Sequence, residues 1–312
     1  TLVKFTVEWN ETKDTEFWGT WVVKATHQED WTEWEEVDDY CDKKGRDGKT
    51  ERVKCGSHTE YRYHPDEYHV TFASSDMKTV DADEYHRLEH LYGKLYHNRS
   101  EGHFHDYHRA KSRSGSGYFH ATVWPGTNET FQAATLEKTY VNKVQAAKQS
   151  LFHFQKIRKE DKAHFGIYDY PPIKNHYHQD AILAPEGVLN GSANDKLVEW
   201  NAKLGPTKQV KMFVFVYRNQ PIEAAFIQQS YLQGGNKNEF ILCIGIDDQN
   251  DIQWAYPITW TENEVLKVKI RDYAASQNKL YLDMIVDHMI PAIQEEFQRK
   301  HFKDFDYLQV ET

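Results

Sequence analysis

The sequence contains no run of about 18 apolar residues, no excess of basic residues and none of the common phosphate-loop or nucleophile motifs. Its 38 Lys and Arg residues stand against 48 Asp and Glu residues, which gives a formal net charge of −10 at pH 7. Because proteins that bind a phosphate backbone present a basic face, this balance argues against a nucleic-acid partner. We expect contact with a membrane only through a segment that this chain does not contain.

Cysteine is scarce, with three residues in 312, and their positions leave more than one structure open. Cys41 and Cys55 flank a loop rich in Gly, Lys and Asp, which favours a disulfide if the compartment is oxidising. Two thiolates and two imidazoles would instead suit a structural zinc site, and free thiols are a third alternative. The residues of this disulfide or zinc alternative are Cys41, Cys55, His58 and His64. Cys243 lies in the apolar run 240–246 and is expected to be a small buried side chain.

Aromatic residues make up 14% of the chain, which disordered sequences lack, so we expect a folded protein with a core rich in Trp, Tyr and Phe. The residue composition and the spacing of apolar residues change along the chain, and this change predicts an α+β fold in two domains. Residues 1–165 are predicted to form a β-rich domain with many His and aromatic residues. Residues 166–190 are predicted to be a connector, and residues 191–312 an α/β sandwich domain.

Short runs of β-type residues, bounded by Pro, Gly, Asp or Ser, predict the strands of the first domain. These runs are residues 17–26, 61–63, 68–73 and 118–124. Residues 83–93 predict a short helix with an acidic first turn and Gly93 as a left-handed cap. The segment 131–154 is left open between a helix and strands, because its apolar spacing fits a helix while its Thr, Val and Tyr content favours strands.

Two nearly continuous apolar runs, residues 211–217 and 240–246, predict strands that are buried on both faces of a sheet. Such strands need helices on both faces, which predicts the α/β sandwich. A third strand is expected at 252–259, and residues 261–270 fit either a capped helix or a strand. Helices are expected from Asn194 or Asp195 to Lys203 with a stop at Gly205-Pro206, over 221–232, and over 280–302 with a bend at Pro291.

Histidine is concentrated in the first domain, where eleven of the 17 residues lie between His27 and His120. The segment from His86 to His90 reads H-x-x-E-H, which matches an arrangement of zinc proteases. On a helix, His86 and His90 lie one turn apart on the same face, as two zinc ligands require. The alternative is that a His-rich chain contains this pattern by chance and that both are ordinary surface side chains.

Carboxylates gather at a turn and around the last predicted helix. Asp247, Asp248 and Asp251 lie on the turn between two predicted strands, and four more flank the helix: Asp283, Asp287, Asp304 and Asp306. Ligands of α/β sheets bind at the carboxyl ends of strands, and oxygen ligands suit Ca²⁺ and Mg²⁺. We therefore predict a divalent-cation site formed by Asp247, Asp248, Asp251 and Asp306. The alternative is a solvated acidic rim.

The order of elements from about Gly187 to Val310, two-fifths of the chain, resembles that of a TPM domain. The matching helix, strands, turn and closing segments are residues 196–203, 210–217, 234–238, 240–246, 290–291 and 302–307. The chain departs from the family at residues 257–261, which replace a glycine-rich segment. It departs again at Phe305-Asp306-Tyr307, where the family has Gly-Asp-Tyr.

The resemblance implies an α/β sandwich in a protein that is anchored at a membrane and faces away from the cytoplasm. Proteins with this domain often act as accessory or assembly factors, and weak phosphatase activity and divalent-ion binding are attributed to some. The resemblance also implies a leader or an anchor before residue 1. The first domain resembles no family.

These observations predict a non-enzymatic, extracytoplasmic binding or assembly protein that is secreted, periplasmic or at the cell surface. Its β-rich domain is expected to contact a protein partner or a larger assembly, such as a particle or filament, since Tyr and Trp are enriched at interfaces. The alternative is a metal-dependent hydrolase with Ca, Mg or Zn as its cation. It would act as a phosphatase at the acidic cluster or as a zinc enzyme at His86 and His90.

Overall fold

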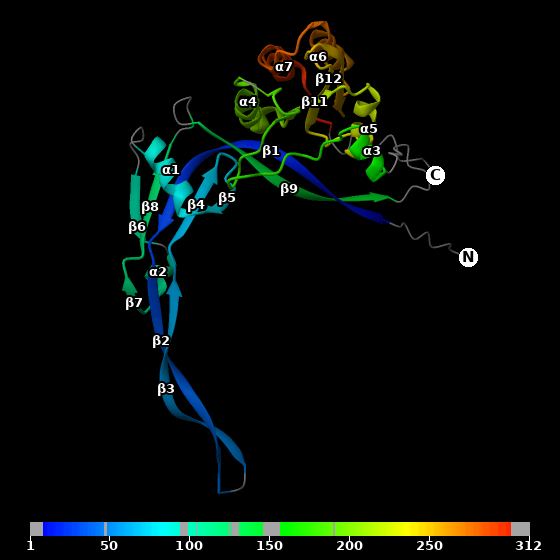
Figure 1. Ribbon diagram of the computed structural model, residues 1–312. Helices are drawn as coiled ribbons and strands as arrows, with labels where there is room; N and C mark the ends of the chain where they lie inside the picture. The colour runs from blue at the N-terminus through cyan, green and yellow to red at the C-terminus, as the bar shows by residue number, and fades with distance from the viewer. Residues whose placement is uncertain are drawn as a thin grey trace, which may run out of the picture. The chain divides into compact units, whose positions relative to one another are not determined.

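The computed structural model describes residues 9–46, 49–93, 99–103, 105–124, 126, 131–145, 157–189 and 191–300 (Figure 1). The chain folds into two compact units. The α/β unit comprises the residues up to 21 together with 132–312, and the arm unit comprises 22–131. This division differs from the expected boundary near residue 165. The reason is that strand β1 (Trp9–Gln28) pairs with strand β9 (Gln132–Gln145), a pairing between segments far apart in the sequence.

The α/β unit is organised around a four-stranded sheet in the order β10 (Ile182–Leu183), β11 (Lys211–Arg218), β12 (Glu239–Ile246), β13 (Ile252–Thr259). β10, β11 and β12 are parallel, and β13 is antiparallel to β12. Every residue of β12, and every residue of β11 except its last, is buried. The two doubly buried strands expected from the apolar runs are therefore confirmed.

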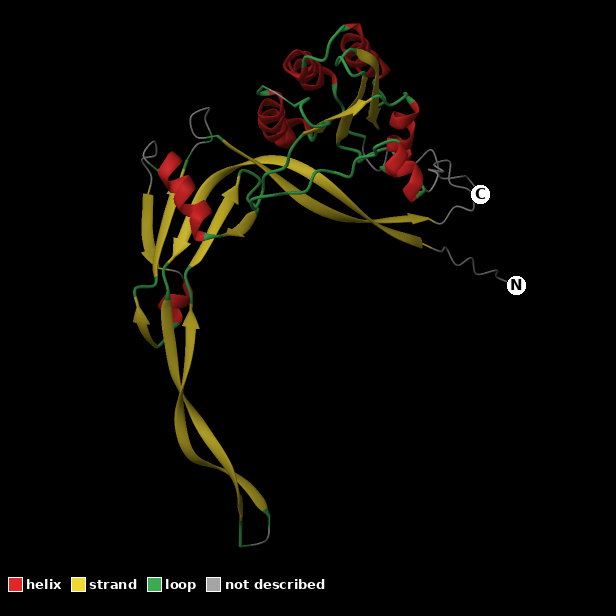
Figure 2. Cartoon of the chain, viewed as in Figure 1, coloured by secondary structure: helices red, strands yellow, loops and turns green. Residues whose placement is uncertain are grey.

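Helices cover both faces of this sheet (Figure 2). One face packs against α4 (Ala193–Lys208), α6 (Glu264–Ser276) and α7 (Leu282–Glu296) through alternate strand residues such as Val214 and Leu242. The opposite face, with Phe213, Phe215 and Cys243, packs against α5 (Glu223–Tyr231). Short helix α3 (Lys159–His164) precedes Ile167, which joins the same cluster. Mixed helices and strands place the chain in the α+β class that the sequence predicts.

The segment 166–190, expected to be a connector, is packed into the α/β unit. Ile167, Tyr177, Ala181 and Val188 are all buried. The side chain of Asn194 accepts hydrogen bonds from the backbone N–H groups of Ala181 and Ile182, at 3.0 and 3.1 Å. The sequence suggested Asn194 or Asp195 as the cap of α4. Instead Asn194 holds this segment, and the helix begins after Ser192.

Three helix ends differ from their expected positions. α4 continues through Pro206 to Lys208 and ends at Gln209 with φ of 53°, because a proline in the last turn removes only one late hydrogen bond. The segment 261–270, left open between a capped helix and a strand, leads into helix α6 (Glu264–Ser276), and the cap is Asn263, whose side chain accepts from Leu266 N–H. α7 ends at Glu296, before the expected 302, and keeps Pro291 inside the helix.

The larger sheet of the arm unit is antiparallel, in the order β5–β4–β1–β8–β6. The second half of β1 pairs with β4 (Glu67–Phe72) and β8 (Tyr118–Val123). β5 (Met77–Val80) extends the sheet beyond β4, and β6 (Arg99–His103) extends it beyond β8. Helix α1 (Ala82–Tyr92) contributes Tyr85 and Leu88 to the core. Its end residue Gly93 has φ of −60°, so the expected left-handed cap is wrong: the backbone stays right-handed and donates to Glu89 O.

The smaller sheet of the arm unit has the order β3–β2–β7. It consists of β2 (Trp31–Lys44), β3 (Thr50–His64) and β7 (Ser112–Gly115), with the short helix α2 (His105–Arg109) before β7. The segment 131–154, for which the sequence left helix or strand undecided, forms strand β9 over 132–145. Residues 146–156 lie outside the described ranges. None of the described helices is long and apolar enough to cross a membrane.

Candidate functional site

The most exposed part of the arm unit is the hairpin of β2 and β3, residues 31–64, here called the arm. β7 pairs only with Trp31–Trp34, so beyond these residues the described part of the arm is a ribbon of two strands (Figure 2). Trp31 is the only buried residue in either strand. A two-stranded hairpin that buries neither face is marginally stable in water, so the arm requires other stabilising contacts.

The first stabilising contact is an aromatic cluster at the base of the arm. Trp31 is 1% exposed, and its indole stacks on the His64 imidazole with ring centroids 4.0 Å apart. Tyr107 packs edge-on against Trp31 at 5.3 Å, and the Arg113 guanidinium lies 4.5 Å from the centre of the Tyr107 ring. Arg113 also donates to the backbone carbonyls of Tyr107 and Ala110. This cluster joins the arm to α2 and β7.

The second stabilising contact is a disulfide between Cys41 and Cys55, whose Cα atoms are 5.8 Å apart. Closing a loop of this length stabilises a fold by about 3 kcal/mol in the chain-entropy account. Because both sulfur atoms are bonded to each other, neither is available to zinc. His58 and His64 instead contact the carboxylates of Asp39 and Glu33. The alternative zinc site at Cys41, Cys55, His58 and His64 is therefore not assembled.

Thiol titration tests the disulfide directly. Cys243 is a free, buried cysteine, so protein unfolded in denaturant without reductant should react at one of its three cysteines. After reduction all three cysteines should react with the thiol reagent. Finding all three thiols reactive before reduction would contradict the bridge.

The cross-strand register sorts the arm's side chains onto two faces with different chemistry. Directly opposed residues share a face, and faces alternate along each strand. The register shift between Asp39 and Tyr40 skips Cys55 and keeps Tyr40 opposite Lys54. The aromatic face carries Thr32, Trp34, Glu36, Asp38, Tyr40, Asp42, Lys44, Thr50, Arg52, Lys54, Ser57, Thr59, Tyr61 and Tyr63. The charged face carries Trp31, Glu33, Glu35, Val37, Asp39, Cys41, Lys43, Glu51, Val53, Gly56, His58, Glu60, Arg62 and His64.

Ion pairs occupy the charged face. His58 contacts Asp39 through Nδ1 at 2.7 Å and Glu60 through Nε2 at 3.2 Å. The Asp39 contact, and then the Glu60 contact, raises the pKa of the His58 imidazole above its usual value. Glu33 lies 3.1 Å from His64 and 3.7 Å from Arg62. Asp39, Glu60 and Glu33 thus each have a partner within the arm.

The aromatic face is the part of the arm with the most exposed apolar surface. Tyr40, Tyr61 and Tyr63 are 53%, 72% and 61% exposed, although tyrosine is a large side chain that gains from burial. Trp34 lies opposite Tyr61, with ring centroids 6.4 Å apart. The Arg52 guanidinium lies 5.5 Å from the centre of the Tyr40 ring. Exposed aromatic rings beside unburied cations are typical of interfaces before their partner binds.

The sequence interpretation noted residues 61–63 as a short strand but did not identify this face. The signal was present in residues 57–63, where Ser57, Thr59, Tyr61 and Tyr63 alternate with charged side chains. Alternation with a period of two indicates a strand with two unlike faces. The interpretation missed it because neither face is apolar enough to be taken for a core.

His86 and His90 both lie on α1 of the arm unit, one turn apart, as expected. The side chain of His86 is 61% exposed and packs against the rings of Tyr68 and Tyr85. Its Nδ1 lies 3.7 Å from Glu89. In the described part of the chain, no group of three His, Cys, Asp or Glu side chains is arranged to hold a metal ion.

In the acidic turn between β12 and β13, each carboxylate contacts a different set of neighbouring groups. Asp247 Oδ1 accepts from the backbone N–H groups of Gln249 and Asp251, at 2.9 and 2.8 Å. Asp248 accepts from the Asn219 side chain, and Asp251 pairs with Lys279 at 2.9 Å. These bonds hold the turn in shape, so the three carboxylates are not directed at one point. Asp306, the fourth predicted ligand, lies outside the described residues.

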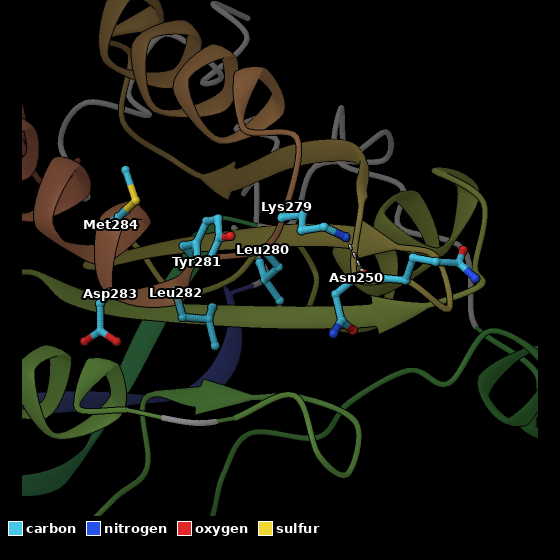
Figure 3. A pocket seen from close by; sticks show the side chains of 8 residues that line it. Asn250, Lys279, Leu280, Tyr281, Leu282, Asp283 and Met284 are labelled. Atoms are coloured by element: carbon cyan, nitrogen blue, oxygen red, sulfur yellow. Dashed lines mark hydrogen bonds between the residues drawn. The ribbon is translucent and has the colours of Figure 1, made fainter.

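A pocket of about 320 Å³ lies beside this turn, at the start of α7 (Figure 3). Its lining is Gln249, Asn250, Lys279, Leu280, Tyr281, Leu282, Asp283 and Met284. Lys279 is held by Asp251 and by the Gln249 carbonyl, and Asp283 accepts from Ser192. Among the lining residues, therefore, the charged groups contact neighbours of the fold and form no acid–base pair.

A buried polar pair at the start of β11 and β12 was not anticipated. Lys211 and Glu239 are register partners and are both fully buried. Lys211 Nζ donates to Thr135 Oγ1 at 2.8 Å, and Tyr170 donates to Glu239 at 2.5 Å. Burial lowers the pKa of Lys211 to about 7 and raises that of Glu239. Perturbed groups often mark active sites, but the described pocket lies elsewhere, so we regard this pair as part of the fold.

Comparison of the chain with protein-family models, with curated protein sequences and with solved structures gives no significant match.

Proposed function

We propose that this chain is a non-enzymatic binding or assembly protein that contacts a protein partner through the aromatic face of the arm. The observation that carries the proposal is the exposure of Tyr40, Tyr61 and Tyr63 on one face of a stabilised ribbon. Removing such apolar surface from water is worth about 25 cal/mol per Å². The disulfide and the Trp31 cluster hold the ribbon in place before binding, which lowers the entropy cost of association.

We propose an extracytoplasmic location for this activity. Disulfides form and persist in oxidising compartments, and they are rare in the cytosol. The Cys41–Cys55 bridge supports the proposal because it lies in the exposed part of the arm, where the reductants of a cytosol would reach and reduce it.

The α/β unit is proposed to be the supporting domain, related to TPM domains. Its elements α4, β11, α5, β12, β13 and α7 follow the order on which that resemblance rests, with α6 added before the closing helix. Of the carboxylates suggested for a cation, Asp247, Asp248 and Asp251 each contact a neighbour in the fold, so we favour the binding function over the hydrolase.

Photo-crosslinking in the cells that produce the protein tests the proposal. Tyr61 is replaced by benzoylphenylalanine, which keeps an aromatic ring on the aromatic face. The matched control places the same group at Arg62, the next residue, which lies on the charged face. We expect covalent protein adducts from position 61 that exceed those from position 62 by tenfold or more, measured by blotting and identified by mass spectrometry.

Equal adducts at both positions, or none at position 61, would show that the aromatic face is not the contact surface. Both side chains are exposed, so neither replacement should disturb the fold, and near-UV circular dichroism checks this for each variant.

A further inference from the structure

The aromatic face has a pattern that allows it to pair with itself. β2 contributes the acidic side chains Glu36, Asp38 and Asp42, and β3 contributes the basic side chains Arg52 and Lys54. Lys44 follows at the end of β2, and Lys54 pairs with Asp38 at 2.5 Å within one arm. The acidic groups thus lie mainly along one edge of the face, and Arg52 and Lys54 lie along the other. The rings of Trp34 and Tyr61 face each other nearer the base of the arm.

We propose that the partner of the aromatic face is the same face of a second copy of this chain, related by a two-fold axis that runs along the arm. This inference rests on the proposed binding function and names its partner. Two copies then make the same contact twice, because residue i of one copy meets residue j of the other and residue j meets residue i.

With this two-fold axis, residues that are opposite each other within one arm also face each other between the two arms. Rotation about an axis along the strands brings β2 of one copy over β3 of the other at the same height. The cross-strand pairs of one arm then recur between copies: Trp34 over Tyr61, Tyr40 over Lys54, and Asp42 over Arg52. Aromatic surface meets aromatic surface at the base, Glu36 and Asp38 meet the hydroxyl side chains Thr59 and Ser57, and Asp42 meets Arg52 toward the tip.

Other pairings are less favourable. An axis across the strands would place β2 on β2 in antiparallel register, so that the mainly acidic edges of the two copies would meet, with Glu36 on Asp42 when the axis crosses at Asp39. Pairing through the charged face would bring Glu33 onto Arg62 and Lys43 onto Glu51, but also Glu35 onto Glu60. That face carries five carboxylates against two Lys or Arg side chains, whereas the aromatic face carries three acids and three bases and is neutral. Charge complementarity therefore selects the aromatic face and the axis along the arm.

The size of the face limits the area that two copies can bury. A strand of 14 residues at ~3.3 Å each, in a ribbon ~10 Å wide, offers ~450 Å² per copy and ~900 Å² in total. This is at the low end for specific protein interfaces, so we expect a reversible dimer and not an obligate one.

Sedimentation velocity of the full, oxidised chain tests the inference through two charge reversals, Asp42→Lys and Arg52→Glu. The wild type is expected to shift from monomer to dimer as concentration rises. Each single variant should dimerise at least tenfold more weakly, because like charges then meet across the axis. An equal mixture of the two variants should regain wild-type affinity. In the mixed dimer the two reversed side chains meet each other at one of the two symmetric contacts, and the native Asp42 and Arg52 meet at the other.

The mixture separates pairing from misfolding, since neither variant is refolded by mixing. A wild type that stays monomeric at all concentrations, or a mixture no tighter than its components, would overturn the inference. The crosslinked adducts at position 61 separate it from the proposed function. An adduct between two copies supports both, and an adduct only with a different protein supports the binding function while refuting self-pairing.

Discussion

Replacement of Arg299 by alanine is expected to lower the free energy of unfolding of the α/β unit by about 3–5 kcal/mol, the usual cost of leaving a buried charge without its partner. Arg299 Nη2 donates to both carboxylate oxygens of Glu16, at 3.0 and 2.9 Å. The Glu16 side chain is only 6% exposed, so it cannot recover these bonds from water. The guanidinium also lies 5.3 Å from the centre of the Trp18 ring, which adds a cation–π contact.

Urea unfolding followed by circular dichroism measures this loss. Arg271 provides the matched control, since it pairs with Asp272 while both side chains are about half exposed. Arg271→Ala should change the unfolding free energy by less than ~1 kcal/mol. The double variant Glu16→Leu/Arg299→Leu should be more stable than Arg299→Ala, because no charge is then left buried. A loss from Arg299→Ala as small as that of the control would contradict the prediction.

Lys211→Met is expected to remove a large pH dependence of stability. The Lys211 amine has a pKa of about 7 in the fold, below its ordinary value of 10.5, because burial disfavours its charge; the nearby Glu239 acts in the opposite direction. Between pH 7 and 10.5 the unfolded chain therefore binds more protons at this site than the folded chain. Stability rises with pH across that window, and below pH 7 the full penalty for charging the amine is present.

At 1.36 kcal/mol per pKa unit, the wild type should gain about 3 kcal/mol relative to Lys211→Met between pH 7 and 9.5. Urea unfolding at several pH values gives both curves, and other titrating groups cancel because they are common to the two proteins. The control Lys269→Met removes a lysine on the surface whose pKa is raised by Glu296, so the rise should persist. Parallel curves for the wild type and Lys211→Met would show that the buried amine does not titrate in this range.

The central strands of the α/β unit could be predicted from the sequence because neighbouring residues in the chain encode them. Residues 211–217 and 240–246 are continuous apolar runs, and only a sheet covered on both faces buries such strands fully. Lys211 and Glu239 were missed because a single polar residue at the end of a run resembles a strand boundary. Their burial depends on Thr135 and Tyr170, which come from distant segments.

The division into units and the arm were not predictable in the same way. The pairing of β1 with β9 joins segments more than 100 residues apart, and no local pattern encodes it. The strands of the arm bury almost nothing, so no apolar periodicity marks their length. At the acidic turn, the sequence correctly placed Asp247, Asp248 and Asp251 on one turn. It did not show that backbone N–H groups and neighbouring side chains occupy their oxygen atoms.

The topology of the chain makes residues 22–131 an insertion, because the polypeptide leaves the α/β unit after residue 21 and returns at residue 132. Two covalent crossings connect the units, so a protease must cut both to release either one. An insertion of this kind can also be replaced during evolution without changing the strand order of the four-stranded sheet. The unit that carries the proposed binding surface is thereby separated from the unit that carries the four-stranded sheet and its helices.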